Sequence, residues 1–195
     1  DARVPFCEWF VIPYCLWYPF LVITGLYLLR RDRAAFRRYM LFLGSTFLLS
    51  ELIWFLLPNG QDLRPAVLPR ENLLTALIAG LYRVDTNTNV FPSVHVLGSV
   101  GAALAVWDCC ALSEKKLLRA GAAALAAVIC LSTVLIKQHA VLDVVGGLLL
   151  GGLFFVVLML GPHFLGLRPN LYKFSDGFPS CVYTLTRNFF DVKCR

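Results

Sequence analysis

The sequence predicts an all-α fold, a polytopic helical membrane bundle, from its composition and from the distribution of its apolar residues. Of the 195 residues, 58% are hydrophobic and 15% are charged, whereas a typical soluble domain is about 25% charged. The apolar residues occur in long runs, several of them close to the roughly 20 residues that a helix needs to cross a bilayer. These features exclude a soluble domain, a disordered chain, collagen and a coiled coil.

Five runs of the sequence predict membrane spans, and together they predict a helical bundle over residues 1–160. The runs are Trp9–Leu29, Tyr39–Leu57, Val94–Leu112, Ala120–Ile136 and His139–Leu160. The longest connection between them, the outer loop 58–92, contains the apolar stretch Asn72–Tyr82. This stretch is too short to cross a membrane, so we expect an interfacial or re-entrant helix there.

The basic residues predict how the bundle is oriented. If the spans alternate, 13 of the 18 Lys and Arg residues lie on one side and five on the other. Because Lys and Arg accumulate in cytoplasmic loops, residues 161–195 are predicted to be a cytoplasmic tail of a plasma-membrane protein, and the loop 58–92 to lie outside. Basic residues that set the orientation of the spans and attract anionic membrane lipids explain the net charge of +6, so no nucleic-acid partner is expected. The oligomeric state stays open.

Cysteine and histidine spacing predicts neither disulfides nor a metal site. The seven cysteines fall within spans and on both sides of the membrane, which does not form a disulfide framework. No Cys/His pair has the spacing of a zinc site. We therefore expect no metal and no cofactor.

Two of the three histidines fall at the outer ends of predicted spans, where polar side chains are costly and usually face a bundle interior or a wet cavity. His139 and Asp143 are four residues apart, so on a helix they share a face. The carboxylate would fix the imidazole tautomer and leave the other nitrogen free for nucleophilic attack. The alternative is a histidine that is only held in place within the bundle.

The second histidine, His95, follows Pro92-Ser93-Val94 where the third span begins. Ser93 is a plausible N-cap, and free amides at a helix N-terminus bind anions. The alternative is an ordinary capped helix at the lipid interface. Arg64, in the outer loop, has the donor geometry that matches phosphate oxygens, although a solvated arginine would look the same.

Taken in order, these motifs resemble those of the type 2 phosphatidic-acid phosphatase superfamily, in the integral-membrane branch near lipid phosphatases and sphingolipid headgroup transferases. The family motifs are Lys-x6-Arg-Pro, Pro-Ser-Gly-His and Ser-Arg-x5-His-x3-Asp. In this chain they read Leu57…Arg64-Pro65, Pro92-Ser93-Val94-His95 and Ser132-Thr133…His139…Asp143. Members of this branch have six spans, so the resemblance implies six spans in the full-length protein, with the five seen here as the second to sixth.

The chain departs from the family motifs at three positions, two of which hold cationic phosphate ligands. Leu57 replaces the lysine of the first motif, Val94 the glycine of the second and Thr133 the arginine of the third. On a continuing helix, Lys137 would lie one turn above Thr133, and we expect it to replace the arginine. We expect Arg83 or Arg70 to serve for the lysine.

The resemblance implies a phosphorylated lipid as substrate, membrane lipids as surroundings, and a phosphohistidine intermediate. His139 would attack phosphorus, Asp143 would stabilise its imidazolium, and His95 would protonate the leaving group. The phosphate oxygens would be held by Arg64, Ser93, Lys137, Arg83 and the amides at the start of the third span, including that of Val94.

Three functions fit this reading of the sequence. The first is a metal-independent lipid phosphate phosphatase at the extracytoplasmic face. The second is a lipid headgroup phosphotransferase, of the inositol- or choline-phosphate type, on the same site. The third is a catalytically silent scaffold that binds lipid phosphates.

Overall fold

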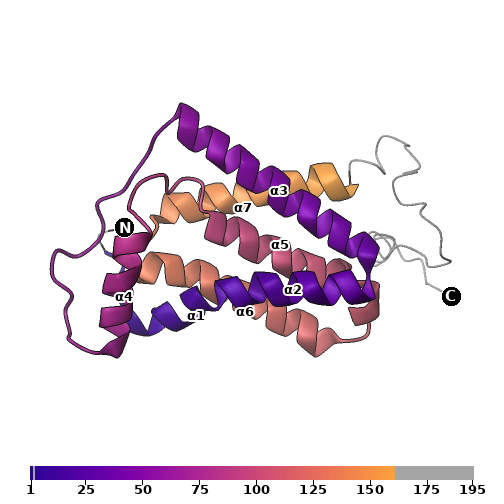
Figure 1. Ribbon diagram of the computed structural model, residues 1–195, viewed down its shortest axis with the longest axis horizontal. Helices are drawn as coiled ribbons and strands as arrows, with labels where there is room; N and C mark the ends of the chain where they lie inside the picture. Colours follow the sequence, from indigo (N-terminus) through magenta and orange to yellow (C-terminus); the bar gives the residue numbers. More distant parts are fainter. Residues whose placement is uncertain (2, 161–195) are drawn as a thin grey trace.

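The computed structural model describes residue 1 and residues 3–160, and this part of the chain is built from helices without a β-strand (Figure 1). The α-helices are α1 (Val11–Cys15), α2 (Trp17–Arg31), α3 (Arg33–Leu56), α4 (Leu73–Val84), α5 (Val94–Asp108), α6 (Lys116–Leu135) and α7 (Val141–Phe155). Short 3-10 turns cover Glu8–Phe10 and Cys110–Leu112, and a π-helical turn, Val156–Leu160, extends α7. The all-α prediction is confirmed. The predicted tail, 161–195, lies outside the described residues.

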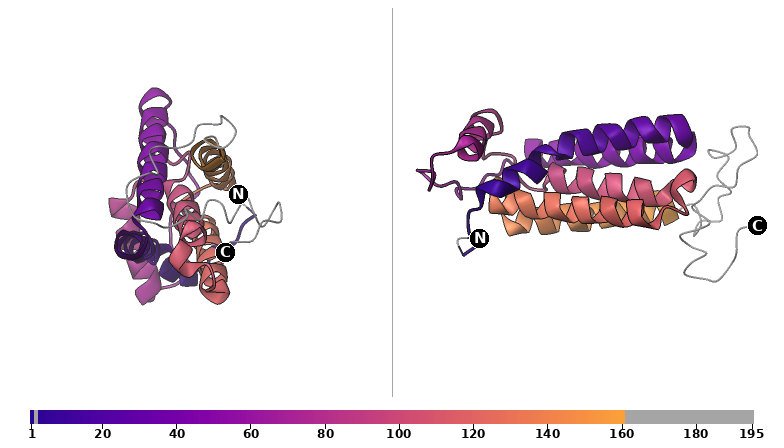
Figure 2. Two further views of the ribbon diagram at one scale, coloured as in Figure 1. Left: turned by 90° about the vertical axis from the view of Figure 1, so that its right-hand side faces the viewer. Right: turned by 90° about the horizontal axis from the view of Figure 1, so that it is seen from below.

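Four helical segments in the described chain are long and apolar enough to cross a membrane. They are Glu8–Arg31, which contains α1 and α2, then Arg33–Leu56, Lys116–Leu135 and Val141–Leu158. They run side by side along the long axis of the molecule (Figures 1 and 2). Four such segments in this short chain indicate an integral membrane protein.

The third predicted span is shorter than expected. The run Val94–Leu112 is not one helix, because α5 ends at Asp108 after 15 residues and a 3-10 turn follows. Ten of the 15 residues are buried, and α5 packs against α2, α3, α6 and α7 in the middle of the bundle (Figure 2, left). A helix surrounded by other helices is apolar on all sides, and bilayer thickness does not set its length.

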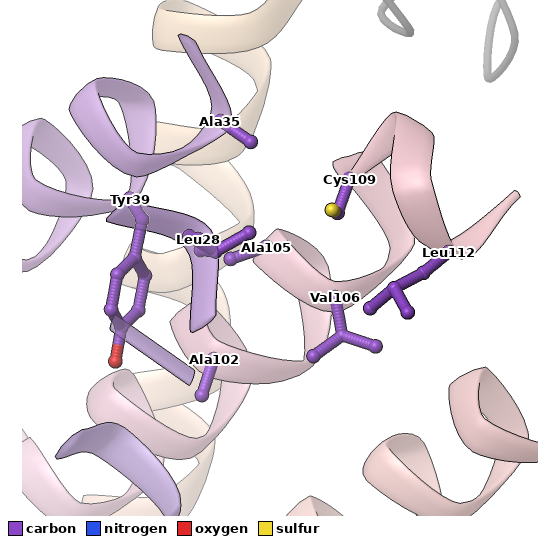
Figure 3. Packing of buried hydrophobic residues seen from close by; sticks show 8 residues of the cluster. All are labelled: Leu28, Ala35, Tyr39, Ala102, Ala105, Val106, Cys109 and Leu112. Atoms are coloured by element: carbon purple, nitrogen blue, oxygen red, sulfur yellow. The ribbon is translucent and has the colours of Figure 1, made fainter. Parts of the chain in front are cut away.

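Small residues let the other helices approach α5 closely. A Cβ atom added to Gly98 would lie 2.7 Å from Nε1 of Trp17, and one added to Gly101 would lie 2.7 Å from the ring of Phe42. Further along α5, a buried cluster joins it to α2, α3 and the Cys110–Leu112 turn (Figure 3). Its members are Leu28, Ala35, Tyr39, Ala102, Ala105, Val106, Cys109 and Leu112.

A buried ion pair fixes α3 to the C-terminal end of α5. Nη2 of Arg38 lies 2.5 Å from Oδ2 of Asp108, and both side chains are at most 5% exposed. Nearby, the Asp32 carboxylate accepts hydrogen bonds from the amides of Ala35, in the first turn of α3, and Cys110. These contacts hold together the end of the bundle at which α2 passes into α3.

Helix α4 lies across the opposite end of the bundle, within the long loop between α3 and α5 (Figure 1). Asn72 caps its N-terminus by accepting from the amide of Thr75, whose hydroxyl accepts from the amide of Asn72. The loop is closed on itself by an antiparallel bridge between Gly60 and Thr88. Asn59 accepts from the amides that immediately precede Pro92, so the loop fixes the start of α5.

Candidate active site

Two histidines that are 44 positions apart in the sequence meet at the end of the bundle covered by the long loop. His95 lies in the first turn of α5, and His139 lies in the connection between α6 and α7. Their ring centroids are 5.7 Å apart, and the residues are 5% and 6% exposed. The structure therefore brings together the two histidines that the sequence motifs single out.

The capped start of α5 positions His95. Ser93 is the N-cap residue, and its Oγ accepts from the amide of Val96. The amide of Ser93 itself donates to the backbone carbonyl of Asp143 at 3.2 Å. Val94, the first residue of α5, is half-buried beside them. This arrangement ties the first turn of α5 to the first turn of α7.

A left-handed turn at the end of α6 positions His139. Helix α6 ends at Leu135, Lys137 has a φ of 59°, and the amides of Gln138 and His139 both donate to the carbonyl of Thr133. This pattern of capping bonds reverses the chain direction. The expectation that Lys137 stacks above Thr133 on a continuing helix is therefore wrong.

Asp143 lies beside His139, although the two residues do not share one continuous helix. Helix α7 begins at Val141, so His139 precedes it, and the Asp143 carboxylate reaches back toward the helix start. Its Oδ2 accepts from the amide of Ala140 at 2.7 Å and lies 3.5 Å from Nδ1 of His139. The second distance is longer than a good hydrogen bond but is within electrostatic range.

Aromatic rings enclose His95. Its ring stacks on Tyr14 of α1, at 4.4 Å between centroids, and lies 4.5 Å from the ring of Trp17 at the start of α2. Both ring nitrogens of His95, Nε1 of Trp17 and Nδ1 of His139 are buried without a hydrogen-bond partner in the described chain. Buried polar atoms are normally paired, so this group of atoms has the capacity to bind a polar ligand.

A polar network connects the histidines to the long loop, and Gln138 is at its centre. Nε2 of Gln138 donates to Oδ2 of Asp85 at 2.9 Å, and the hydroxyl of Tyr14 donates to the same oxygen at 2.7 Å. Oε1 of Gln138 accepts from Nη2 of Arg64 at 2.5 Å. The network therefore links the residue next to His139 with the residue that stacks on His95.

Sequence reasoning did not identify Tyr14, Trp17, Asp85 or Gln138. The two aromatic residues belong to an apolar run in which nothing distinguishes a site-facing ring from a lipid-facing one. Gln138 did carry a signal, because an amide between a lysine and a histidine at the end of a span is costly to bury without a partner.

Arg64 reaches this network from the long loop, and both of its Nη atoms donate to protein acceptors, whereas its Nε is buried without a partner in the described chain. Nη1 donates to the carbonyl of Tyr82 at 2.9 Å, and Nη2 also donates to the carbonyl of Asp85 at 2.5 Å. The guanidinium carbon lies 4.4 Å from the centroid of the Tyr82 ring. Burial lowers the pKa of Arg64 and raises that of Tyr82 to about 12. Arg64 therefore holds the C-terminal end of α4 against the site.

The other predicted cations bind other partners or are exposed. The ammonium of Lys137 donates to the carbonyls of Asp1 and Val4, at 3.1 and 2.5 Å. Arg70 forms an ion pair with Glu8, and Arg83 is exposed on α4. In the described part of the chain, no hydrogen bond or ion pair joins these three cations to either histidine.

Residues 38–167 match the model of the PAP2 superfamily. The matched segment contains both histidines, Asp143 and Arg64, and it lacks Tyr14 and Trp17. The chain has no match among the curated proteins and none among the solved structures.

Proposed function

The chain belongs to the PAP2 superfamily, which indicates phosphatase or phosphotransferase chemistry on lipid phosphates, and on this premise we propose that it is a metal-independent lipid phosphate phosphatase. The observation that carries the proposal is the pairing of His95 and His139, buried and 5.7 Å apart, with Asp143 beside the second ring. One imidazole that attacks phosphorus and a second that handles the leaving-group proton are the requirements of a two-step phosphoryl transfer.

In the first step, Nε2 of His139 attacks phosphorus, and the bond from phosphorus to the lipid alkoxide breaks as the N–P bond forms. Nδ1 lies on the side of Asp143, which supports Nε2 as the nucleophile. The carboxylate stabilises the positive charge that develops on the imidazole. His95 gives a proton to the departing alkoxide, so the lipid leaves as an alcohol and a phosphohistidine remains.

In the second step, His95 accepts a proton from water as the water oxygen attacks phosphorus. The N–P bond breaks, inorganic phosphate leaves, and both imidazoles return to their starting protonation states. A lipid hydroxyl in place of water gives a new phospholipid instead of free phosphate. The same residues then act as a headgroup phosphotransferase, so the acceptor alone distinguishes the two activities.

The phosphate oxygens are held by Ser93, the amide of Val94, Arg64 and Lys137, with Arg83 as an outer cation. Arg64 and Lys137 exchange carbonyl acceptors for phosphate oxygens when substrate binds. Charge-assisted bonds to phosphate are stronger than bonds to neutral carbonyls, which favours this exchange. Fixed cations of this kind stabilise the charge that develops on the equatorial oxygens.

The site acts at the extracytoplasmic face, and the C-terminus lies in the cytoplasm. In support, the histidines lie at the end of the bundle that α4 covers, whereas the basic turn between α2 and α3 lies at the opposite end (Figure 1). Since Lys and Arg favour the cytoplasmic side, this arrangement directs the site outward.

The experiment supplies the purified protein with a panel of lipid phosphates, with and without a lipid alcohol. Free phosphate without the alcohol supports the phosphatase, and a new phospholipid formed only with the alcohol supports the transferase. If neither product forms while lipid phosphates still bind, the protein is a silent scaffold. EDTA should leave the rate unchanged, and complete loss of activity with the chelator would contradict the metal-independent mechanism.

A further inference from the structure

A cavity lies at the end of the bundle away from the histidines. It is a groove of about 950 Å³ between α2, from Phe20 to Leu28, and the N-terminal half of α6. Ligand pockets usually have volumes of about 300–1,000 Å³, so its size is at the upper end of that range. Its walls are almost entirely apolar and include Phe20, Tyr27, Val106, Leu112, Leu118 and Leu125.

The groove follows from the way in which the helices pack. Close to the histidines, α1 packs against α6, whereas further along the bundle α2 and α6 both pack on α5. Val106 of α5 and Leu112 of the following turn line the space and point toward one another (Figure 3). Gly121 lines the wall on α6, and a Cβ atom added to it would meet nothing within 4 Å. The groove is thus open space next to a well-packed core.

The charged residues at the groove are concentrated at one end. Lys115 and Lys116, where α6 begins, line it together with Glu114, and all three are exposed. In the described chain, neither lysine forms an ion pair. The basic turn between α2 and α3 is at the same end of the bundle (Figure 1). An occupant with an apolar body and an anionic end would match both the walls and the charge of this groove.

We propose that this groove is a binding site for an anionic phospholipid, separate from the histidine site. One acyl chain lies between α2 and α6, over Val106 and Leu112. The phosphate of the headgroup contacts the ammonium groups of Lys115 and Lys116. Amphipathic lipids combine these two features, and anionic headgroups on the cytoplasmic side attract lysines close to the surface.

The first test is native mass spectrometry of the purified full chain with phosphatidylglycerol or phosphatidylcholine. The wild-type protein should retain phosphatidylglycerol preferentially. Changing both lysines, K115Q/K116Q, should weaken phosphatidylglycerol binding about 30-fold, as expected for two lysines near an anionic headgroup. The control R33Q/R37Q removes two exposed charges at the same end of the bundle that do not line the groove. If both double variants lost the same amount of phosphatidylglycerol binding, the loss would come from the overall positive charge of this end of the bundle, and the proposal would be overturned.

The second test fills the groove without disturbing the core. Gly121→Trp should weaken binding of phosphatidylglycerol by at least about tenfold, because excluding even two methylene groups has an effect of that size. Gly44→Trp is the matched control, since a Cβ atom at Gly44 also meets nothing within 4 Å and Gly44 does not line the groove. Unchanged lipid binding in Gly121→Trp would overturn the proposal. A wild-type protein that carries no lipid, whether monomeric or dimeric, would also overturn it, because another part of the chain or a second copy would then fill the groove.

Discussion

The amide of Ser93 donates a hydrogen bond to the backbone carbonyl of Asp143, at 3.2 Å, and joins the residue that caps α5 to the residue that faces His139. The contact is possible because α5 and α7 approach closely at Gly147. A Cβ atom added to Gly147 would lie 2.9 Å from Cβ of Val96 and 3.0 Å from the carbonyl oxygen of Ser93. The distance between the two histidines therefore depends on the glycine at position 147.

Gly147→Ala should separate the two helices and lower both stability and turnover. Alanine favours a helix by about 1 kcal/mol over glycine, but overpacking a tight interface costs about 1–3 kcal/mol, so the clash dominates. Thermal unfolding in detergent and kcat/KM are the measurements. Gly152→Ala is the control, because its Cβ would meet nothing within 4 Å. If Gly147→Ala raised the melting temperature as much as the control does, the close approach would be wrong.

His139→Ala should abolish turnover, with a loss of at least about 10⁴-fold, because no other group replaces a missing nucleophile. The measurements are phosphate release and acid-labile phosphate bound to the protein. His163→Ala, in the segment beyond the described residues, should have little effect and serves as the control. Bound acid-labile phosphate in His139→Ala would exclude this residue as the nucleophile.

His95→Ala should lower the rate about 10²–10⁴-fold with a natural lipid alkoxide, the usual contribution of a general acid. In this variant, the rate of the first step should return toward the wild-type value with a substrate whose leaving group is a nitrophenolate, since such a group departs without a proton. A burst of nitrophenol measured in His95→Ala and in His139→Ala separates the two roles. An equal defect of both variants with this substrate would contradict the assignment of His95 as the acid.

Tyr14 contributes a ring that stacks on His95 and a hydroxyl that bonds to Asp85, and two substitutions separate these contributions. Tyr14→Phe keeps the ring and should cost about 1–2 kcal/mol of stability, because the hydroxyl donates to Asp85 and also accepts a long bond from Nε2 of Gln138. Tyr14→Leu also removes the stacked ring and should lower kcat/KM further, because His95 is then less constrained. Melting temperature and kcat/KM are measured for both variants. Equal kcat/KM values for Phe and Leu would mean that the stacking does not position His95.

Lys137 has a left-handed backbone conformation and a buried ammonium group. Comparing Lys137→Ala with Lys137→Gly separates the effect of the backbone from that of the ammonium. Glycine adopts a φ of 59° without strain, so the glycine variant should be about 1 kcal/mol more stable than the alanine variant. If the ammonium binds phosphate, both variants should lose about 10²–10³-fold in rate. A glycine variant with wild-type kcat/KM would show that Lys137 does not replace the missing arginine.

The sequence predicted the helices and the residues of the histidine pair, because hydrophobic runs and motif spacing are local properties. The predicted span Ala120–Ile136 ends within one residue of α6, but the sequence did not predict the left-handed turn at Lys137, since neither Ile136 nor Lys137 is the glycine or asparagine that usually marks such a cap. Nor could it show that α5 lies at the centre of the bundle, where its neighbours replace lipid. That placement depends on which faces of the other helices pack together, which is a tertiary property.

The unpredicted turn at the end of α6 also explains why the position expected for Lys137 was wrong. Its distance in sequence from Thr133 would match one helical turn only if the helix continued, and the chain instead turns back at that point. Tyr14 and Trp17 were missed for a related reason, because an aromatic side chain in an apolar span has the same local pattern whether it faces lipid or a histidine. Contacts between distant segments decide both cases.

The central position of α5 has a consequence for how a substrate arrives. Fifteen helical residues extend about 22 Å, whereas the 24 residues of α3 extend about 36 Å, longer than the roughly 30 Å hydrocarbon core. His95 sits in the opening turn of the shorter helix, beneath the loop that carries α4. Because His95 is only 5% exposed there, a phosphate group would have to lose its bulk water before it could reach the imidazole.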